Sequence, residues 1–119
     1  MEKLTKQEEQ AMLAIWHTGE GFVKDFLEKV TGDPPHYNTF VSTIKNLEKK
    51  GYVANRKVGN MYQYYPVVEE AEYKKQFLTG VVKDHFANSY KELVSFFAEQ
   101  NKISPKELKE IIDMIEKKK

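Results

Sequence analysis

Residues 36–63 read His-Tyr-Asn-Thr-Phe-Val-Ser-Thr-Ile-Lys-Asn-Leu-Glu-Lys-Lys-Gly-Tyr-Val-Ala-Asn-Arg-Lys-Val-Gly-Asn-Met-Tyr-Gln, and this stretch decides the fold. In its first half, Phe40, Ile44 and Leu47 recur at helical spacing, which predicts a helix over about 37–50 with one apolar face. The opposite face is polar. Gly51 then stands where a helix commonly ends in the left-handed conformation.

The second half of the stretch predicts a β-hairpin over residues 53–65. Gly59 and Asn60 separate two β-prone runs and favour a tight two-residue turn. Pairing across that turn places Arg56 opposite Gln63 and Lys57 opposite Tyr62. A helix followed directly by a basic hairpin predicts a winged helix-turn-helix, in a mainly α (α+β) chain.

The residues before this stretch predict two further helices. Thr5 and Glu8 have the spacing of a capping box, and an apolar face follows it at Met12, Ile15 and Trp16. A second apolar stripe predicts a short helix that stops near Gly32; its members are Val23, Phe26, Leu27 and Val30. The prolines at 34 and 35 cannot continue a helix, so an extended connection should lead into the helix at 37–50.

After residue 67 the pattern becomes helical and strongly apolar on one side. Ser104, Pro105 and Glu107 mark the start of a last helix. About 50 residues are near the lower limit for an independent core, so these stripes predict a helical dimerisation segment. We therefore expect a DNA-binding domain at 1–67 and a dimerisation domain at 68–119; the alternative is a monomer whose last helices fold back on the first domain. The candidate dimerisation residues are Phe77, Val81, Phe86, Leu93, Phe97, Leu108, Ile111, Ile112 and Ile115.

The charge distribution indicates an anionic partner. The whole chain of 119 residues has a formal charge of +1, yet residues 36–62 hold five Lys and Arg against Glu48 alone. A localised basic segment is what nucleic acid requires, whereas a chance cluster of solvated lysines is the competing interpretation. Small hydrogen-bonding side chains followed by lysines suit a helix that meets base edges and then phosphates. The candidate DNA-binding residues are Asn38, Thr39, Ser42, Lys45, Asn46, Lys49, Arg56, Lys57 and Asn60.

Three tyrosines of the second hairpin strand allow two interpretations. Tyr62, Tyr64 and Tyr65 could stack on bases, but aromatic residues are favoured in strands in any case. We expect them to pack the hairpin onto the helices.

Composition excludes several other functions. There is no cysteine, which rules out disulfides and thiolate metal sites. The three histidines are widely spaced, and no nucleophile–base pair or phosphate-binding loop occurs. We predict no enzyme, no metal and no cofactor. No apolar run is long enough for a membrane span, so the expected compartment is the cytoplasm.

Taken together, these motifs resemble the penicillinase-repressor family of winged-helix regulators, the BlaI/MecI/CopY type. The matching segments are Leu4–Trp16, Thr39–Leu47, Lys50–Val53, Tyr62–Glu70, Leu93–Val94 and Ile103–Leu108. The resemblance implies a homodimeric transcriptional repressor that binds a pseudo-palindromic double-stranded DNA operator. By their match to the family's recognition helix, the resemblance implies that Thr39, Ser42 and Lys45 face the DNA. Asn46 replaces the family's usual Arg, so the operator sequence does not transfer.

The resemblance also concerns induction. In antibiotic-responsive members a sensor-linked protease cuts an Asn-Phe bond, and the corresponding pair here is Phe96-Phe97. Copper-responsive members carry a C-terminal cysteine cluster, which this chain lacks. The protease is therefore the one further partner that the resemblance suggests. The alternative function is a winged-helix protein-interaction module that does not bind DNA.

Overall fold

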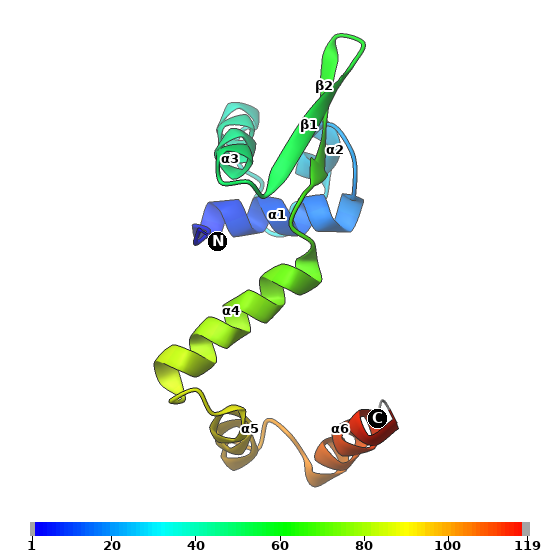
Figure 1. The fold of residues 1–119 in the computed structure, drawn as a ribbon. Helices are drawn as coiled ribbons and strands as arrows, with labels where there is room; N and C mark the ends of the chain where they lie inside the picture. The colour runs from blue at the N-terminus through cyan, green and yellow to red at the C-terminus, as the bar shows by residue number, and fades with distance from the viewer. Residues whose placement is uncertain (1, 118–119) are drawn as a thin grey trace. The chain divides into compact units, whose positions relative to one another are not determined.

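Eight elements follow one another along the chain in the computed structural model, which describes residues 2–117 (Figure 1). They are α1 (Lys6–Thr18), α2 (Val23–Glu28), α3 (Tyr37–Lys49), β1 (Val53–Val58), β2 (Met61–Pro66), α4 (Glu70–His85), α5 (Tyr90–Glu99) and α6 (Pro105–Lys117). The chain divides into two compact units, of which the first ends at Tyr73 and the second begins at Lys74.

Local sequence signals account for most helix ends. The predicted capping box at the start of α1 is confirmed: the Glu8 N–H donates to Thr5 Oγ1 at 3.1 Å, and the Thr5 N–H donates to Glu8 Oε1 at 2.8 Å. Helix α2 is shorter than predicted, because it ends at Glu28 and excludes Val30. The reason is a tightened last turn, in which the Val30 N–H bonds to the Leu27 carbonyl at 3.3 Å.

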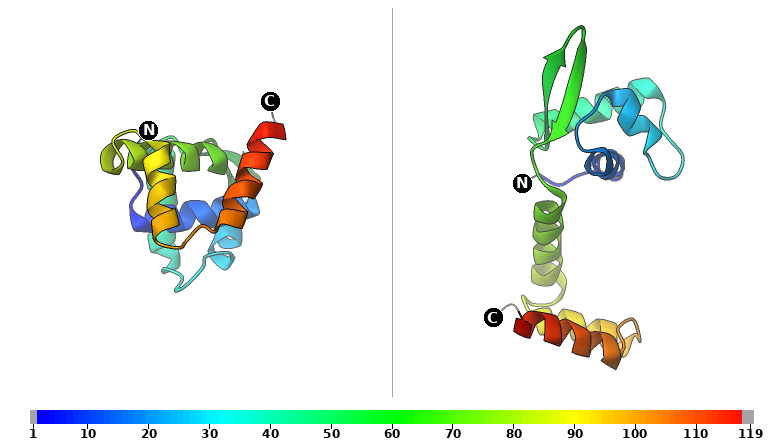
Figure 2. Two further views of the ribbon diagram at one scale, coloured as in Figure 1. Left: turned by 90° about the horizontal axis from the view of Figure 1, so that it is seen from below. Right: turned by 90° about the vertical axis from the view of Figure 1, so that its right-hand side faces the viewer.

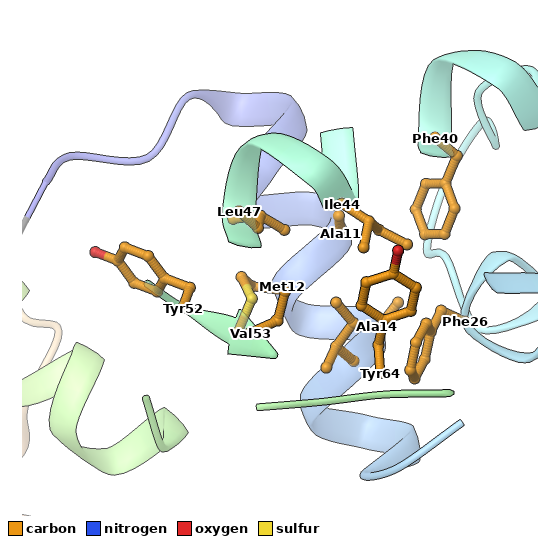
Figure 3. Packing of buried hydrophobic residues seen from close by; sticks show 11 residues of the cluster. Ala11, Met12, Ala14, Phe26, Phe40, Ile44, Leu47, Tyr52, Val53 and Tyr64 are labelled. Atoms are coloured by element: carbon orange, nitrogen blue, oxygen red, sulfur yellow. The ribbon is translucent and has the colours of Figure 1, made fainter. Parts of the chain in front are cut away.

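The core of the first unit lies between α1, α2, α3 and the base of the hairpin (Figure 3). Phe40, Ile44 and Leu47 are each at most 1% exposed, which confirms the predicted inward face of α3. They meet Met12 of α1 and Phe26 of α2, which are both fully buried. Burying side chains of this size stabilises a fold by roughly 1.5–3 kcal/mol each. This packing fixes which face of α3 points outward.

Strands β1 and β2 form an antiparallel hairpin with the predicted register. Arg56 pairs with Gln63 and Lys57 pairs with Tyr62. Gly59 has φ +63°, the left-handed conformation that the first position of a tight hairpin turn favours in glycine. The hairpin extends away from α1, α2 and α3 in the views of Figures 1 and 2. A three-helix core with such a hairpin is a winged helix-turn-helix.

The second unit has little core of its own. Among its side chains whose burial the structure describes, the buried hydrophobic ones are Val82 and Leu93, at 1% and 8% exposed. Helix α5 begins at a side-chain cap, since Ser89 accepts a hydrogen bond from the Glu92 N–H. Large side chains on all three helices are exposed: Phe77, Leu78, Tyr90, Val94, Phe96, Phe97, Ile111, Ile112 and Met114. None of the helices within residues 2–117 combines the length and apolar character that crossing a membrane requires.

Candidate nucleic-acid interface

The nine predicted DNA-binding residues are all exposed, and they lie on α3 and the hairpin. Helix α3 carries Asn38, Thr39, Ser42, Lys45, Asn46 and Lys49, the strand β1 carries Arg56 and Lys57, and the turn carries Asn60. Along α3, positions 38, 42, 45 and 49 form one stripe opposite the buried face. Polar side chains therefore occupy its N-terminal part and lysines its C-terminal part.

The C-terminal end of α3 is fixed by a Schellman motif, which confirms the predicted stop at Gly51. Gly51 has φ +82°, its N–H donates to the Glu48 carbonyl, and the Tyr52 N–H donates to the Leu47 carbonyl, both at 3.0 Å. Tyr52 is 1% exposed and Leu47 is fully buried. The helix and the first strand are thus joined rigidly through the core.

Lys50, one of the five cations of the basic segment, does not belong to this surface. Its Nζ lies 2.6 Å from Glu8 Oε1 and also donates to the Lys3 carbonyl at 2.9 Å. Burial raises the pKa of the Glu8 carboxyl, but the hydrogen bonds from Lys50 and from the Thr5 backbone outweigh it, so the pKa lies below its ordinary value. Lys50 therefore fastens the end of α3 to the start of α1.

Arg56 is also engaged within the protein. Its guanidinium forms an ion pair with Glu20, in the loop between α1 and α2, and lies over the Tyr65 ring at 5.2 Å from its centroid. A bridge between Gly21 and Tyr64, with N–H···O distances of 2.7 and 3.0 Å, holds that loop against β2. The basic segment is thus partly neutralised. Among residues 2–117 we find no ion pair to Lys45, Lys49 or Lys57.

The only acid on α3 points toward the hairpin. The Glu48 carboxylate accepts a hydrogen bond from the side-chain amide of Asn55 in β1. This contact removes the acid from the outer stripe of α3. It also joins α3 to the face of the hairpin that carries Asn55.

The tyrosines of β2 divide between the core and the surface. Tyr64 is 7% exposed and packs in the core, as predicted, and Tyr65 is partly buried beneath Arg56. The prediction for Tyr62 is wrong, since this side chain is 53% exposed. The reason is the length of the hairpin: Tyr64 and Tyr62 share one face, but only Tyr64 is close enough to the helices to be covered.

An aromatic cluster fixes the exit from the hairpin. Trp16 donates its Nε1–H to the Val68 carbonyl at 2.9 Å, and its ring lies 5.4 Å from that of Tyr73. The Tyr73 hydroxyl donates to Glu9 Oε2 at 2.7 Å; burial and this bond raise the pKa of Tyr73, which keeps its proton. The first turn of α4 is therefore anchored to α1.

A winged helix-turn-helix whose second helix shows a polar stripe and unpaired lysines defines a DNA-binding regulator. The chain belongs to the penicillinase repressor family, whose model matches residues 4–117. It is similar to the methicillin resistance regulatory protein MecI of Staphylococcus aureus (strain N315), with 24% identity over 117 residues, covering 98% of this chain and 95% of MecI. The MecI proteins of Staphylococcus epidermidis and Mammaliicoccus sciuri match with the same identity and coverage. The protein is a DNA-binding transcriptional repressor and not an enzyme.

Proposed function

We propose that the protein represses transcription as a homodimer bound to a pseudo-palindromic operator, with α3 of each subunit in the major groove. The observation that carries this is the outer stripe of α3, which is exposed, free of acid and rigidly backed by the core. Asn38, Thr39 and Ser42 would meet base edges, because short polar side chains near a helix N-terminus suit that contact. Lys45 and Lys49 would meet phosphates. Asn46 lies beside Lys45 on the same exposed surface.

The hairpin at 53–65 would lie on the DNA backbone beside the major groove. Lys57 is the exposed cation there that has no ion pair within residues 2–117. Arg56 is paired with Glu20, so a phosphate would have to share the guanidinium with that carboxylate or replace it.

Dimerisation would use residues 68–119. The second unit exposes Phe77 by 59%, Ile111 by 46% and Ile112 by 53%, so large apolar side chains on α4 and α6 are open to solvent in the single chain. Phe97 is exposed, whereas Val81, Phe86 and Leu108 are half-buried and Leu93 is buried. The remaining candidate, Ile115, lies in α6, but its side chain is outside the described residues. A second copy of the chain would cover these stripes.

Induction by a sensor-linked protease remains a prediction of the family resemblance. The Phe96-Phe97 bond lies inside α5, and both side chains are exposed, at 47% and 40%. A protease would have to unwind this helix to reach the peptide bond.

Selection of bound fragments from random duplex DNA, at about 150 mM salt, tests the proposed function. We expect an enriched palindrome with half-sites about one helical turn apart. Retention of DNA without a motif, lost as salt rises, would contradict operator reading and favour a protein-docking module.

Lys45→Ala is expected to weaken binding to the selected operator without lowering the melting temperature, because Lys45 is exposed and packs on nothing in the core. A phosphate contact would weaken all sequences alike and reduce the salt slope by about one, whereas a base contact would cost about 1–3 kcal/mol and relax one position of the motif. Fluorescence anisotropy on operator and scrambled duplexes separates these results. Equal affinity of the variant and the wild type would remove Lys45 from the interface; Lys106→Ala, in the second unit, is the control.

Glu20→Gln is expected to strengthen binding to all duplexes by a few-fold, because it releases the Arg56 guanidinium for a phosphate. The slope of log K against log salt should steepen by about 0.9, the value for one added phosphate contact. Glu28→Gln, which removes another exposed acid of the first unit, is the matched control. An unchanged slope would mean that Arg56 does not reach the backbone.

A further inference from the structure

The first turn of α4 belongs to the first unit, although the helix continues beyond it. Tyr73 is the last residue of that unit, and α4 runs on to His85 as one helix. The Tyr73 N–H donates to the Glu69 carbonyl at 3.1 Å, so Tyr73 closes the first helical turn. Contacts that fix Tyr73 therefore fix the start of the helix that leads into the second unit.

Three side chains of the first unit contact Tyr73. Its hydroxyl donates to Glu9 Oε2 at 2.7 Å, and its ring centroid lies 5.4 Å from that of Trp16 and 6.0 Å from that of Tyr52. The Tyr52 ring meets it edge-on, with 69° between the planes, an arrangement that aromatic pairs favour. Glu9 and Trp16 belong to α1, whereas Tyr52 stands between α3 and β1. We call Glu9, Trp16, Tyr52 and Tyr73 the α4 anchor.

The α4 anchor also holds the backbone between the hairpin and α4. The N–H groups of Val67 and Val68 both donate to the Tyr52 carbonyl, at 2.8 and 3.2 Å. The Val68 carbonyl accepts from Trp16 Nε1 at 2.9 Å. The Tyr52 N–H is itself bonded to the Leu47 carbonyl of α3 at 3.0 Å. Tyr52 thus connects the end of α3 with the approach to α4 through both of its backbone polar groups.

The Tyr73 hydroxyl does more than packing requires. Phenylalanine would present the same ring to Trp16 and Tyr52 but could not bond to the Glu9 carboxylate. Hydrogen bonds to an ionised carboxylate are shorter and stronger than bonds between neutral groups. The Tyr73–Glu9 bond therefore adds direction to contacts that aromatic rings alone leave free to slide.

We infer that the α4 anchor sets the half-site spacing that the repressor accepts, with Tyr73 as the positioning residue. This rests on the proposed homodimer and its operator. In such a dimer the second half-site is bound at an effective concentration that depends on the length and stiffness of the connection. A fixed start of α4 concentrates this second contact at one spacing. A loosened start spreads it over several spacings and weakens it at the best one.

The test compares Tyr73→Phe with wild type on the selected operator and on versions whose half-sites are one or two base pairs closer or farther apart. We expect about fivefold weaker binding at the best spacing and a flatter dependence of affinity on spacing. Binding to an isolated half-site and the dimer in sedimentation equilibrium should not change, because the exposed face of α3 and the apolar side chains of the second unit are unaltered. Tyr90→Phe is the matched control, since it removes a hydroxyl 3.3 Å from Thr79 Oγ1 in the second unit and should keep the wild-type spacing profile.

A second variant tests whether the bond itself is responsible. Glu9→Ala removes the acceptor and should flatten the spacing profile as Tyr73→Phe does. Because both changes break one contact, Glu9→Ala/Tyr73→Phe should bind no more weakly than either variant alone. A spacing profile that keeps its wild-type shape in Tyr73→Phe, or an equal loss of affinity on the isolated half-site, would overturn the inference and leave operator binding intact. A wild type that binds one half-site as tightly as the whole operator would overturn the proposed dimeric function as well.

Discussion

Replacing Ile112 with glutamate is expected to give monomers and to weaken operator binding by about 100-fold or more. Ile112 is 53% exposed in the single chain, so a charge there leaves the subunit's own core intact. In the proposed dimer the same side chain is buried, and an unpaired carboxylate in an apolar interface is costly. Two linked half-site contacts exceed one by about 10²–10⁴ in affinity, and a monomer loses that factor.

Sedimentation equilibrium and binding to whole and half operators measure the two effects separately. The variant should bind an isolated half-site as a wild-type subunit does, because α3 is untouched. Met114→Glu is the matched control, since Met114 is 62% exposed on the same helix but lies off the stripe of Leu108, Ile111 and Ile112. A dimeric Ile112→Glu protein would show that α6 is not the interface.

Replacing Lys50 with methionine is expected to lower the free energy of unfolding at pH 7 by about 3 kcal/mol, the lower end of what breaking a buried ion pair costs. The side chains of Lys50 and Glu8 are 21% and 6% exposed, and the variant leaves the Glu8 carboxylate buried without its cation. Lys49→Met is the matched control, because Lys49 is exposed and should affect DNA binding but hardly stability.

The loss of unfolding free energy in Lys50→Met should depend on pH in a defined direction. In the wild type the pKa of Glu8 lies below its ordinary value of 4.5, so its contribution to stability is present above pH 4.5 and is lost as pH falls through the lower, folded value. Without Lys50, burial favours the protonated form of the Glu8 carboxyl. The stability of the variant should therefore be lowered most at neutral pH, where this carboxyl would be charged. The difference between the two proteins should therefore shrink from pH 7 toward pH 4.

Urea unfolding at pH 7 and pH 4 measures this difference. Glu8→Gln/Lys50→Met should recover most of the lost stability at pH 7, because no buried charge remains. A Lys50→Met protein as stable as Lys49→Met at pH 7 would contradict the structural role of the pair.

Local signals in the sequence predicted much of the fold. The Thr5–Glu8 capping box, the stop at Gly51 and the hairpin turn at Gly59 each depend on residues that are neighbours along the chain. The stripe of Phe40, Ile44 and Leu47 fixed the outward face of α3 in the same way, since helical periodicity is a local property. The exposed positions of the candidate DNA-binding residues could therefore be predicted, but what they contact could not.

Contacts between distant segments decided which charges and aromatic rings the surface offers. Lys50 and Glu8 are 42 positions apart, and the fold brings them together; the pairing of Arg56 with Glu20 likewise needs the loop between α1 and α2 to lie beside the hairpin. Tyr62 and Tyr64 look alike in the sequence, and only their distances from the helices separate the exposed side chain from the core side chain. The sequence by itself determined the helices, the hairpin and the family. Only the tertiary structure decided which cations are free and which apolar side chains lack cover, because ion pairing and burial depend on chain segments that local patterns do not relate.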